Sequence, residues 1–94
     1  MRLEIITPLG VQLVEENLDE IVVRRLEADY DRGSEVAFLP DHGPELVHTG
    51  TGAVRWTHAD GTAGGAVIAS GFAECAADSV TILTPSIERA SDAH

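Results

Sequence analysis

Four histidines are the side chains of this sequence best suited to bind a metal or to transfer protons: His42, His48, His58 and His94. Histidines that share a metal ion within one element usually stand about two or four positions apart, and no pair here has that spacing. A metal site would therefore require the fold to bring distant histidines together. We expect solvated or hydrogen-bonded histidines, while Asp41 beside His42 keeps the metal alternative open.

The candidate nucleophiles are Ser70 and Cys75. Neither lies in the sharp turn that exposes a nucleophilic serine in hydrolases, and Cys75 stands where a strand residue would pack. The glycines lack the Lys-Ser/Thr ending of a phosphate-binding loop. A single cysteine allows no internal disulfide and no multi-cysteine zinc site, which favours a reducing compartment. The sequence therefore predicts no enzyme and no cofactor.

The composition describes an acidic chain of 94 residues, long enough for one modest core. Sixteen acidic and six basic residues, with no lysine, give a net charge of −10, and 44% of the residues are apolar. Such a surface repels nucleic-acid phosphates and anionic lipids, so we expect a basic protein surface as partner. The N-terminus lacks the apolar core of a signal peptide, and no apolar run spans a bilayer, so we expect a soluble, intracellular protein.

The elements that hold these side chains are predicted to be short strands around a stiff loop. In that loop Pro40 and Pro44 fix their φ angles, and Gly43 permits backbone conformations closed to other residues. Alternating and β-branched residues, separated by turn signals, predict strands on both sides of it. The expected strands cover residues 2–7, 11–14, 18–25, 36–39, 46–49, 53–58, 64–69, 71–75 and 79–83.

A helix over residues 15–26 is the competing interpretation of one segment, because Leu18, Ile21, Val22 and Leu26 fit the spacing of a helical face. The run of β-branched residues at 21–23 favours a strand there. With no convincing long helix, the pattern predicts an all-β fold, an antiparallel β-sandwich or barrel of about 8–10 short strands. We expect it to occupy residues 1–85, followed by a polar tail at 86–94.

Two further features of the sequence bear on this fold. The Asp60-Gly61 pair is a strong signal for a tight hairpin between two strands. Among the aromatic residues, Phe38 and Phe72 are expected to pack in the core. Tyr30 lies in a polar segment and is either a contact residue or a partly buried anchor of its loop.

Three stretches, in order and at matching spacing, resemble the epsilon subunit of F-type ATP synthases. They are Leu-Glu-Ile-Ile-Thr-Pro-Leu-Gly at 3–10, Leu-Pro-Asp-His-Gly-Pro-Glu-Leu at 39–46, and Ser-Gly-Phe-Ala-Glu at 70–74 followed by Val-Thr-Ile-Leu at 80–83. The resemblance covers the family's N-terminal β-sandwich and nearly all of this chain. Asp41 stands where the family has Gly, and Gly43 where it has Ala. The family's C-terminal helical hairpin is missing, as in the short epsilon subunits of alternate F-type ATPases that pump protons or sodium ions.

The resemblance implies a non-catalytic rotor subunit of the central stalk. Such a subunit binds the gamma subunit and the c-ring and couples ion-driven rotation to ATP synthesis or hydrolysis. It implies a peripheral position at the cytoplasmic face of a prokaryotic inner membrane, with membrane contact only through the complex. An acidic loop here would suit a basic loop of the c-ring. The residues implied in the c-ring and gamma interface are Asp31, Arg32, Glu35, Pro40, Asp41, His42, Gly43 and Pro44.

The alternative from another class is a stand-alone β-sandwich or cupin-like protein that binds a metal. It would use His42, His48 and His58 as ligands, and it requires the fold to bring these three side chains to one place.

Overall fold

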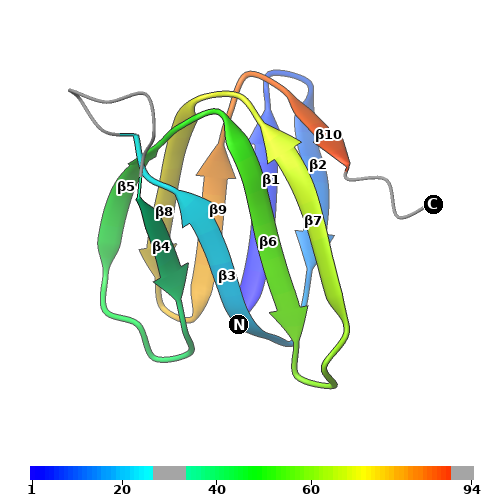
Figure 1. Ribbon diagram of the computed structural model, residues 1–94, viewed down its shortest axis with the longest axis vertical. Coiled ribbons are helices and arrows are strands. Elements are labelled where there is room, and N and C mark those ends of the chain that lie inside the picture. Colours follow the sequence, from blue (N-terminus) through cyan, green and yellow to red (C-terminus); the bar gives the residue numbers. More distant parts are fainter. Residues whose placement is uncertain (27–33, 90–94) are drawn as a thin grey trace.

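The computed structural model describes residues 1–26 and 34–89, which form two five-stranded sheets packed face to face (Figure 1). Sheet A has the strand order β2-β1-β9-β8-β5, and sheet B has the order β10-β7-β6-β3-β4. The predicted all-β sandwich is therefore confirmed. The strands are β1 (Arg2–Thr7), β2 (Gly10–Glu15), β3 (Leu18–Arg24), β4 (Glu35–Phe38), β5 (Glu45–Thr49), β6 (Gly52–His58), β7 (Ala63–Ile68), β8 (Gly71–Ala76), β9 (Ser79–Leu83) and β10 (Ile87–Arg89).

The core lies between the sheets and follows from the alternation of side chains along each strand. Successive side chains of a strand point to opposite faces, so every second residue faces the other sheet. Burial in β1, β3 and β8 follows this period of two. The predicted inward faces are confirmed for Leu3 with Ile5, for Ile21 with Val23 and for Phe38, each of which has an exposed fraction of 0%.

The helix over residues 15–26 is excluded, because residues 18–24 form β3. This strand pairs with β6 on one side and with β4 on the other. Asn17, at φ 58°, forms the turn that separates β3 from β2. Residues 16–17 therefore form a turn between two strands.

Phe72 is exposed to 47%, so the prediction that it packs in the core is wrong. In β8 it is the small residues Gly71, Ala73 and Cys75 that face the core. A Cβ added at Gly71 would lie 2.0 Å from the carbonyl oxygen of Leu83, so the inward position leaves no room for a side chain. Side chains alternate between the two faces along β8, and the larger residue, Phe72, takes the outer face.

Two features of the topology differ from the sequence prediction. The first is a parallel pair in an otherwise antiparallel fold, β1 with β9, in which Arg2 lies opposite Ser79. The second is β10, which pairs with β7 beyond the boundary expected at residue 85. This strand forms because Ile87 packs against the core cluster and Ala69 N–H donates to the Ser86 carbonyl at 3.3 Å. Residues 90–94 lie outside the described residues.

Both open sides of the sandwich are closed by contacts between the sheets. On one side the end of β3 reaches β5, where Leu26 N–H donates to the His48 carbonyl and Gly50 N–H to the Arg24 carbonyl. On the other side Glu15 of β2 hydrogen-bonds His58 Nε2 at 3.0 Å. The two sheets are thereby fixed relative to each other along both sides.

Because consecutive strands run in opposite directions, the turns lie at two opposite ends of the molecule. Figure 1 shows the β4–β5 loop, the β6–β7 hairpin and the N-terminus at its lower end. The β2–β3 turn is at the same end, because β2 runs antiparallel to β1. The β8–β9 turn is also there, because β9 runs parallel to β1 and antiparallel to β8. We call this the lower end, and the opposite one the upper end. Over the described residues there is no helix long and apolar enough to cross a membrane.

Candidate functional site

The loop between β4 and β5 begins with a tight turn whose shape is set by two residues. His42 N–H donates to the Leu39 carbonyl at 3.0 Å, Pro40 occupies the second position, and Asp41 has φ 67°. This is the arrangement of a type II turn, in which the third position requires positive φ and favours glycine. The expectation that Gly43 supplies the unusual backbone conformation is wrong, because the left-handed residue of this loop is Asp41.

His42 fixes the rest of this loop. Its Nε2 hydrogen-bonds Glu45 Oε1 at 2.8 Å, and its ring meets Phe38 edge-on at a centroid distance of 5.2 Å. Glu45 also lies 3.5 Å from the Arg25 guanidinium. The His42 imidazole and the Glu45 carboxylate therefore stabilise the conformation of the loop. The side chain of Asp41, the preceding residue, is exposed next to them.

Four separate turns bring acidic side chains to the lower end of the sandwich. They are Glu16 in the β2–β3 turn, Asp41 in the β4–β5 loop, Asp60 in the β6–β7 hairpin and Asp78 in the β8–β9 turn, and all four residues are exposed. We call them the acidic turns. Two are partly neutralised: Glu16 pairs with Arg2, and Asp78 lies 3.8 Å from the N-terminal amine. Asp41 has no ion-pair partner within the described residues.

The β6–β7 hairpin confirms the prediction made from Asp60-Gly61. Thr57 lies opposite Ala63, and Gly61 adopts φ 93°. The Asp60 carboxylate accepts hydrogen bonds from Thr62 N–H at 2.9 Å and from the Thr62 hydroxyl at 2.7 Å. These hydrogen bonds lower the pKa of Asp60 and favour its charged form, and the bond from the backbone N–H of Thr62 has the largest effect.

Glu35 lies at the start of β4 rather than in the loop. Its carboxylate accepts two hydrogen bonds from Arg55, at 2.9 and 3.1 Å, on the outer face of sheet B. The bonds from Arg55 lower the pKa of Glu35 and raise that of Arg55. Because β4 separates Glu35 from the turn by roughly 10 Å, the structure does not place Glu35 with Asp41. Asp31, Arg32 and Tyr30 lie outside the described residues.

The structure does not bring the histidines of the metal alternative together. His42 lies in the β4–β5 loop, His48 lies on the outer face of sheet A, and His58 ends β6 in sheet B. Each has its own partner: Glu45, the ring of Phe72, and Glu15. No group of three or more possible metal ligands occurs in residues 1–26 and 34–89. His94 lies outside these ranges.

The two candidate nucleophiles have structural roles. Ser70 Oγ donates to the Thr49 carbonyl at 2.9 Å and so holds the turn before β8. Cys75 is buried in the core, and burial raises the pKa of its thiol. A thiol with a raised pKa is a poor nucleophile, so Cys75 packs like a small apolar residue.

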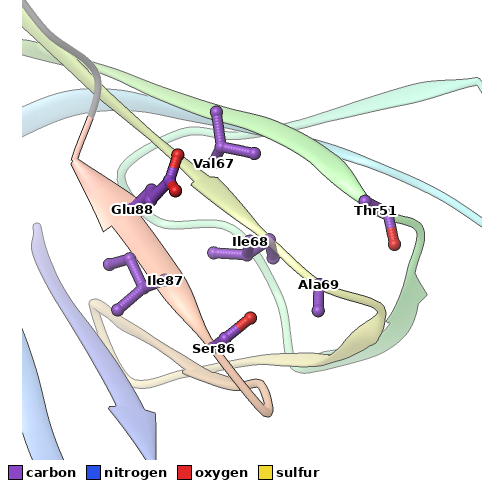
Figure 2. A pocket seen from close by; sticks show the side chains of 7 residues that line it. All are labelled: Thr51, Val67, Ile68, Ala69, Ser86, Ile87 and Glu88. Atoms are coloured by element: carbon purple, nitrogen blue, oxygen red, sulfur yellow. The ribbon is translucent and has the colours of Figure 1, made fainter.

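A hollow of about 340 Å³ lies beside the pairing of β7 with β10 (Figure 2). Val67 and Ile68 come from β7, Ile87 and Glu88 from β10, and Thr51 from the segment just before β6. Glu88 is the only charged residue of this lining. The hollow holds none of the residues expected at the interface, and its side chains form no acid–base pair.

Over residues 1–26 and 34–89 the geometry is that of a small two-sheet β-sandwich with exposed acidic turns, and it brings together none of the histidines or nucleophiles considered above. Its sequence matches the family described as ATP synthase, Delta/Epsilon chain, beta-sandwich domain, over residues 1–90. The chain belongs to this family. It has the epsilon-like β-sandwich of this family, and the delta/epsilon family is a non-catalytic ATP synthase stalk subunit rather than an enzyme in itself. The predicted family is thereby confirmed.

The fold is shared with solved structures, of which two are described here. A chain of the Euglena gracilis mitochondrial ATP synthase, in a structure of OSCP, F1 and c-ring, matches with a TM-score of 0.77 and 22% identity. A chain of the Tetrahymena thermophila mitochondrial ATP synthase, in a structure of the central stalk and c-ring, matches with a TM-score of 0.68 and 13% identity. Each match covers 93% of this chain, but only 51% and 64% of the other. No curated protein matches the sequence.

Sequence reasoning missed the grouping of the acidic turns and the Glu15–His58 contact between sheets. Each acidic residue is unremarkable alone, since turns are commonly polar. The turns meet at one end only because consecutive strands alternate in direction. Counting directions along the predicted meander would have placed the turn at residues 59–62 beside the 39–44 loop. The contact between Glu15 and His58 joins residues 43 positions apart and has no local signal.

Proposed function

We propose that this chain is an epsilon-type rotor subunit that binds the gamma subunit and rests on the c-ring with its lower end. In this role it helps to couple ion-driven rotation of the ring to ATP synthesis or hydrolysis, and it reaches the membrane only through the complex. The position at a prokaryotic inner membrane that was expected from the sequence is also part of this proposal; the two solved structures described above are mitochondrial.

The observation that supports the ring contact best is the grouping of the acidic turns. Glu16, Asp41, Asp60 and Asp78 come from four turns, yet they lie at one end of the sandwich. Complementary charge steers association and fixes orientation, so this end suits a basic polar loop. Of the interface residues expected from the sequence, we assign those at 40–44 to the ring contact, and Asp41 is the main charged residue among them.

The test is association with purified gamma and with the detergent-solubilised c-ring. We expect the wild-type chain to bind both, and Asp41→Arg to weaken binding to the ring by about tenfold, since it places a positive charge against a basic loop. Glu35→Arg should weaken binding less, because Glu35 is separated from the turn by β4. The matched control is Glu88→Arg, the same charge change at an exposed residue of β10.

The results of these binding measurements test the placement of the ring contact and the rotor role separately. Equal binding of wild-type chain and Asp41→Arg to the ring would contradict the placement of the ring contact. A stronger effect of Glu35→Arg than of Asp41→Arg would indicate that the c-ring contact lies beside the β3–β4 pair instead. A wild-type chain that binds neither gamma nor the ring would contradict the rotor role itself.

A further inference from the structure

The hollow beside the pairing of β7 with β10 brings together polar side chains that the fold itself does not use (Figure 2). Three of its lining residues are polar, namely Thr51, Ser86 and Glu88, and all three are exposed. In the part of the chain that the structure describes, none of these side chains has a hydrogen-bond or ion-pair partner. The hollow therefore presents one carboxylate and two hydroxyls whose hydrogen-bonding capacity is left to solvent or to a ligand.

Hydroxyl side chains close by in the sequence are, by contrast, engaged by the fold. Ser70 Oγ donates to the Thr49 carbonyl at 2.9 Å. Thr84 Oγ1 donates to the Ala69 carbonyl at 2.8 Å. A few convergent polar groups in an otherwise apolar depression are typical of a binding site. The hollow therefore has the composition of a site for a group that comes from outside the chain.

Apolar side chains form the walls of the hollow. Val67 lies directly opposite Glu88 in the strand pairing and has an exposed fraction of 44%. Ile87 packs against the core cluster and Ile68 is buried, so Glu88 and Val67, their neighbours in the chain, point to the outer face of sheet B. A long side chain that enters the hollow therefore contacts apolar surface along its length and reaches the Glu88 carboxylate.

The hydrogen-bonding capacity of the lining defines the chemistry of the ligand. A carboxylate only accepts hydrogen bonds, and a hydroxyl can accept them, so a ligand with several N–H donors satisfies all three polar groups. The net charge of −10 also favours a cation. An arginine side chain combines an aliphatic stem, which packs on apolar surface, with a planar guanidinium that carries several N–H donors.

The size and position of the hollow favour a side chain of another protein over a free small molecule. Its volume of about 340 Å³ lies at the lower end of the range of roughly 300–1,000 Å³ typical of small-molecule pockets, and it is open to solvent. It lies at the upper end of the sandwich, where β7 ends and β10 begins. In the orientation proposed above, this end faces away from the c-ring.

We propose that the hollow binds an arginine side chain of a partner protein. The guanidinium donates to the Glu88 carboxylate, and its aliphatic stem packs on Val67 and Ile87. The hydroxyls of Thr51 and Ser86 accept the remaining N–H groups.

The probe is the tripeptide acetyl-Ala-Arg-Ala-amide, and the control peptide carries citrulline, which has the shape of arginine but no charge. Each peptide is titrated into the full chain labelled with ¹⁵N and with ¹³C in the methyl groups of valine and isoleucine. We expect NMR shift changes centred on the methyl groups of Val67 and Ile87 and on the amide of Glu88. The arginine peptide should bind about fivefold more tightly, because hydrogen bonds between charged groups are stronger than those of a neutral donor.

The variant Glu88→Gln tests the charge of the hollow. It should abolish the preference for arginine over citrulline, because the amide keeps the shape of the side chain but not its charge. The matched control is Glu74→Gln, which removes the same charge from an exposed residue of sheet A that has no ion-pair partner in the described ranges. This control should retain the preference. Val67→Ser should weaken both peptides equally, because it removes apolar surface beside the stem.

Three results of the titration would overturn the proposal. The first is equal binding of the two peptides to the wild-type chain. The second is an equal loss of preference in Glu74→Gln and Glu88→Gln, which would show that the peptide responds only to overall charge. The third is a set of shift changes centred on the acidic turns. A wild-type dimer in sedimentation that Glu88→Gln converts to monomer would show that a second copy of this chain fills the hollow instead of another protein.

This site goes beyond the proposed function, and its test is independent of it. Neither gamma nor the c-ring takes part in the titration, so a failure here leaves the rotor role standing. Glu88→Arg should abolish the preference for the arginine peptide and leave ring binding unchanged, because the hollow and the acidic turns lie at opposite ends. Asp41→Arg should do the reverse, with weaker ring binding and unchanged peptide binding.

Discussion

At the scale of single residues, Asp41 combines two properties that favour different side chains. Its backbone, at φ 67°, lies in the region that glycine enters most easily, while its exposed carboxylate belongs to the acidic turns. In the family that the sequence resembles, glycine stands at the position of Asp41. The structure supplies the physical reason for that glycine, and the proposed ring contact supplies a reason for the aspartate.

We therefore expect Asp41→Gly to raise the free energy of unfolding by about 0.5–1 kcal/mol, because it removes the cost of a left-handed non-glycine residue. The same variant should weaken binding to the c-ring, since the carboxylate is lost. Urea unfolding and the ring-binding assay measure the two effects. Asp60→Gly is the matched control: Asp60 accepts hydrogen bonds from Thr62, so its loss should lower stability. A destabilised Asp41→Gly would contradict the turn assignment.

At the scale of strands and turns, the sequence predicted most of the fold because its signals are local. Side-chain alternation identified β1 and β6, and Asp-Gly identified the β6–β7 hairpin. What it could not give depends on neighbours distant in sequence. The outward orientation of Phe72 is fixed by the close approach of Leu83 to Gly71. The pairing of β10 with β7 is a strand of three residues in a segment with little apolar pattern.

The pairing of β6 with β7 contains a contact that makes one glycine indispensable. Trp56 lies opposite Gly64, and a Cβ added at Gly64 would lie 2.4 Å from the indole Nε1. We expect Gly64→Ala to lower the free energy of unfolding by about 2–3 kcal/mol, because the indole must leave its buried position. Urea unfolding, followed by the emission of Trp56, measures both the loss and the displacement.

The matched control for Gly64→Ala is Gly43→Ala. A Cβ at Gly43 meets nothing within 4 Å, and its φ is not in the left-handed region. This variant should retain wild-type stability and the wild-type emission of Trp56. Equal stability of the two variants would contradict the close packing of Trp56 on Gly64.

At the scale of the whole molecule, the dominant property is the excess of negative charge. Sixteen acidic residues face six arginines, and the ion pairs of Arg2 and Arg55 are solvent-exposed. Exposed pairs contribute little to stability, whereas the repulsion among the remaining carboxylates acts throughout the molecule. The net effect of added salt is therefore to relieve repulsion.

We expect the melting temperature at pH 7 to rise by about 5 °C between 10 mM and 500 mM NaCl, as screening shortens the range of repulsion. Near pH 4.5, close to the isoelectric point, the same salt should have little effect. Binding to the c-ring should respond in the opposite direction and weaken with salt, because there the charges attract. Differential scanning fluorimetry and the ring-binding assay measure these trends. A melting temperature that falls with salt at pH 7 would show that local ion pairs outweigh the repulsion.

The parallel pairing of β1 with β9 has a consequence for how the chain acquires its structure. During synthesis the first strand emerges long before residues 79–83, and until they arrive β1 has only β2 as a neighbour in sheet A. The edge of β1 that will face β9 stays unpaired for most of translation, open to strands of other molecules. Because closure waits for contacts between distant parts of the sequence, folding belongs in the slow, millisecond-to-second range typical of β-sandwiches. We therefore expect chaperones to bind nascent chains that end before β9, because these chains expose an unpaired strand edge.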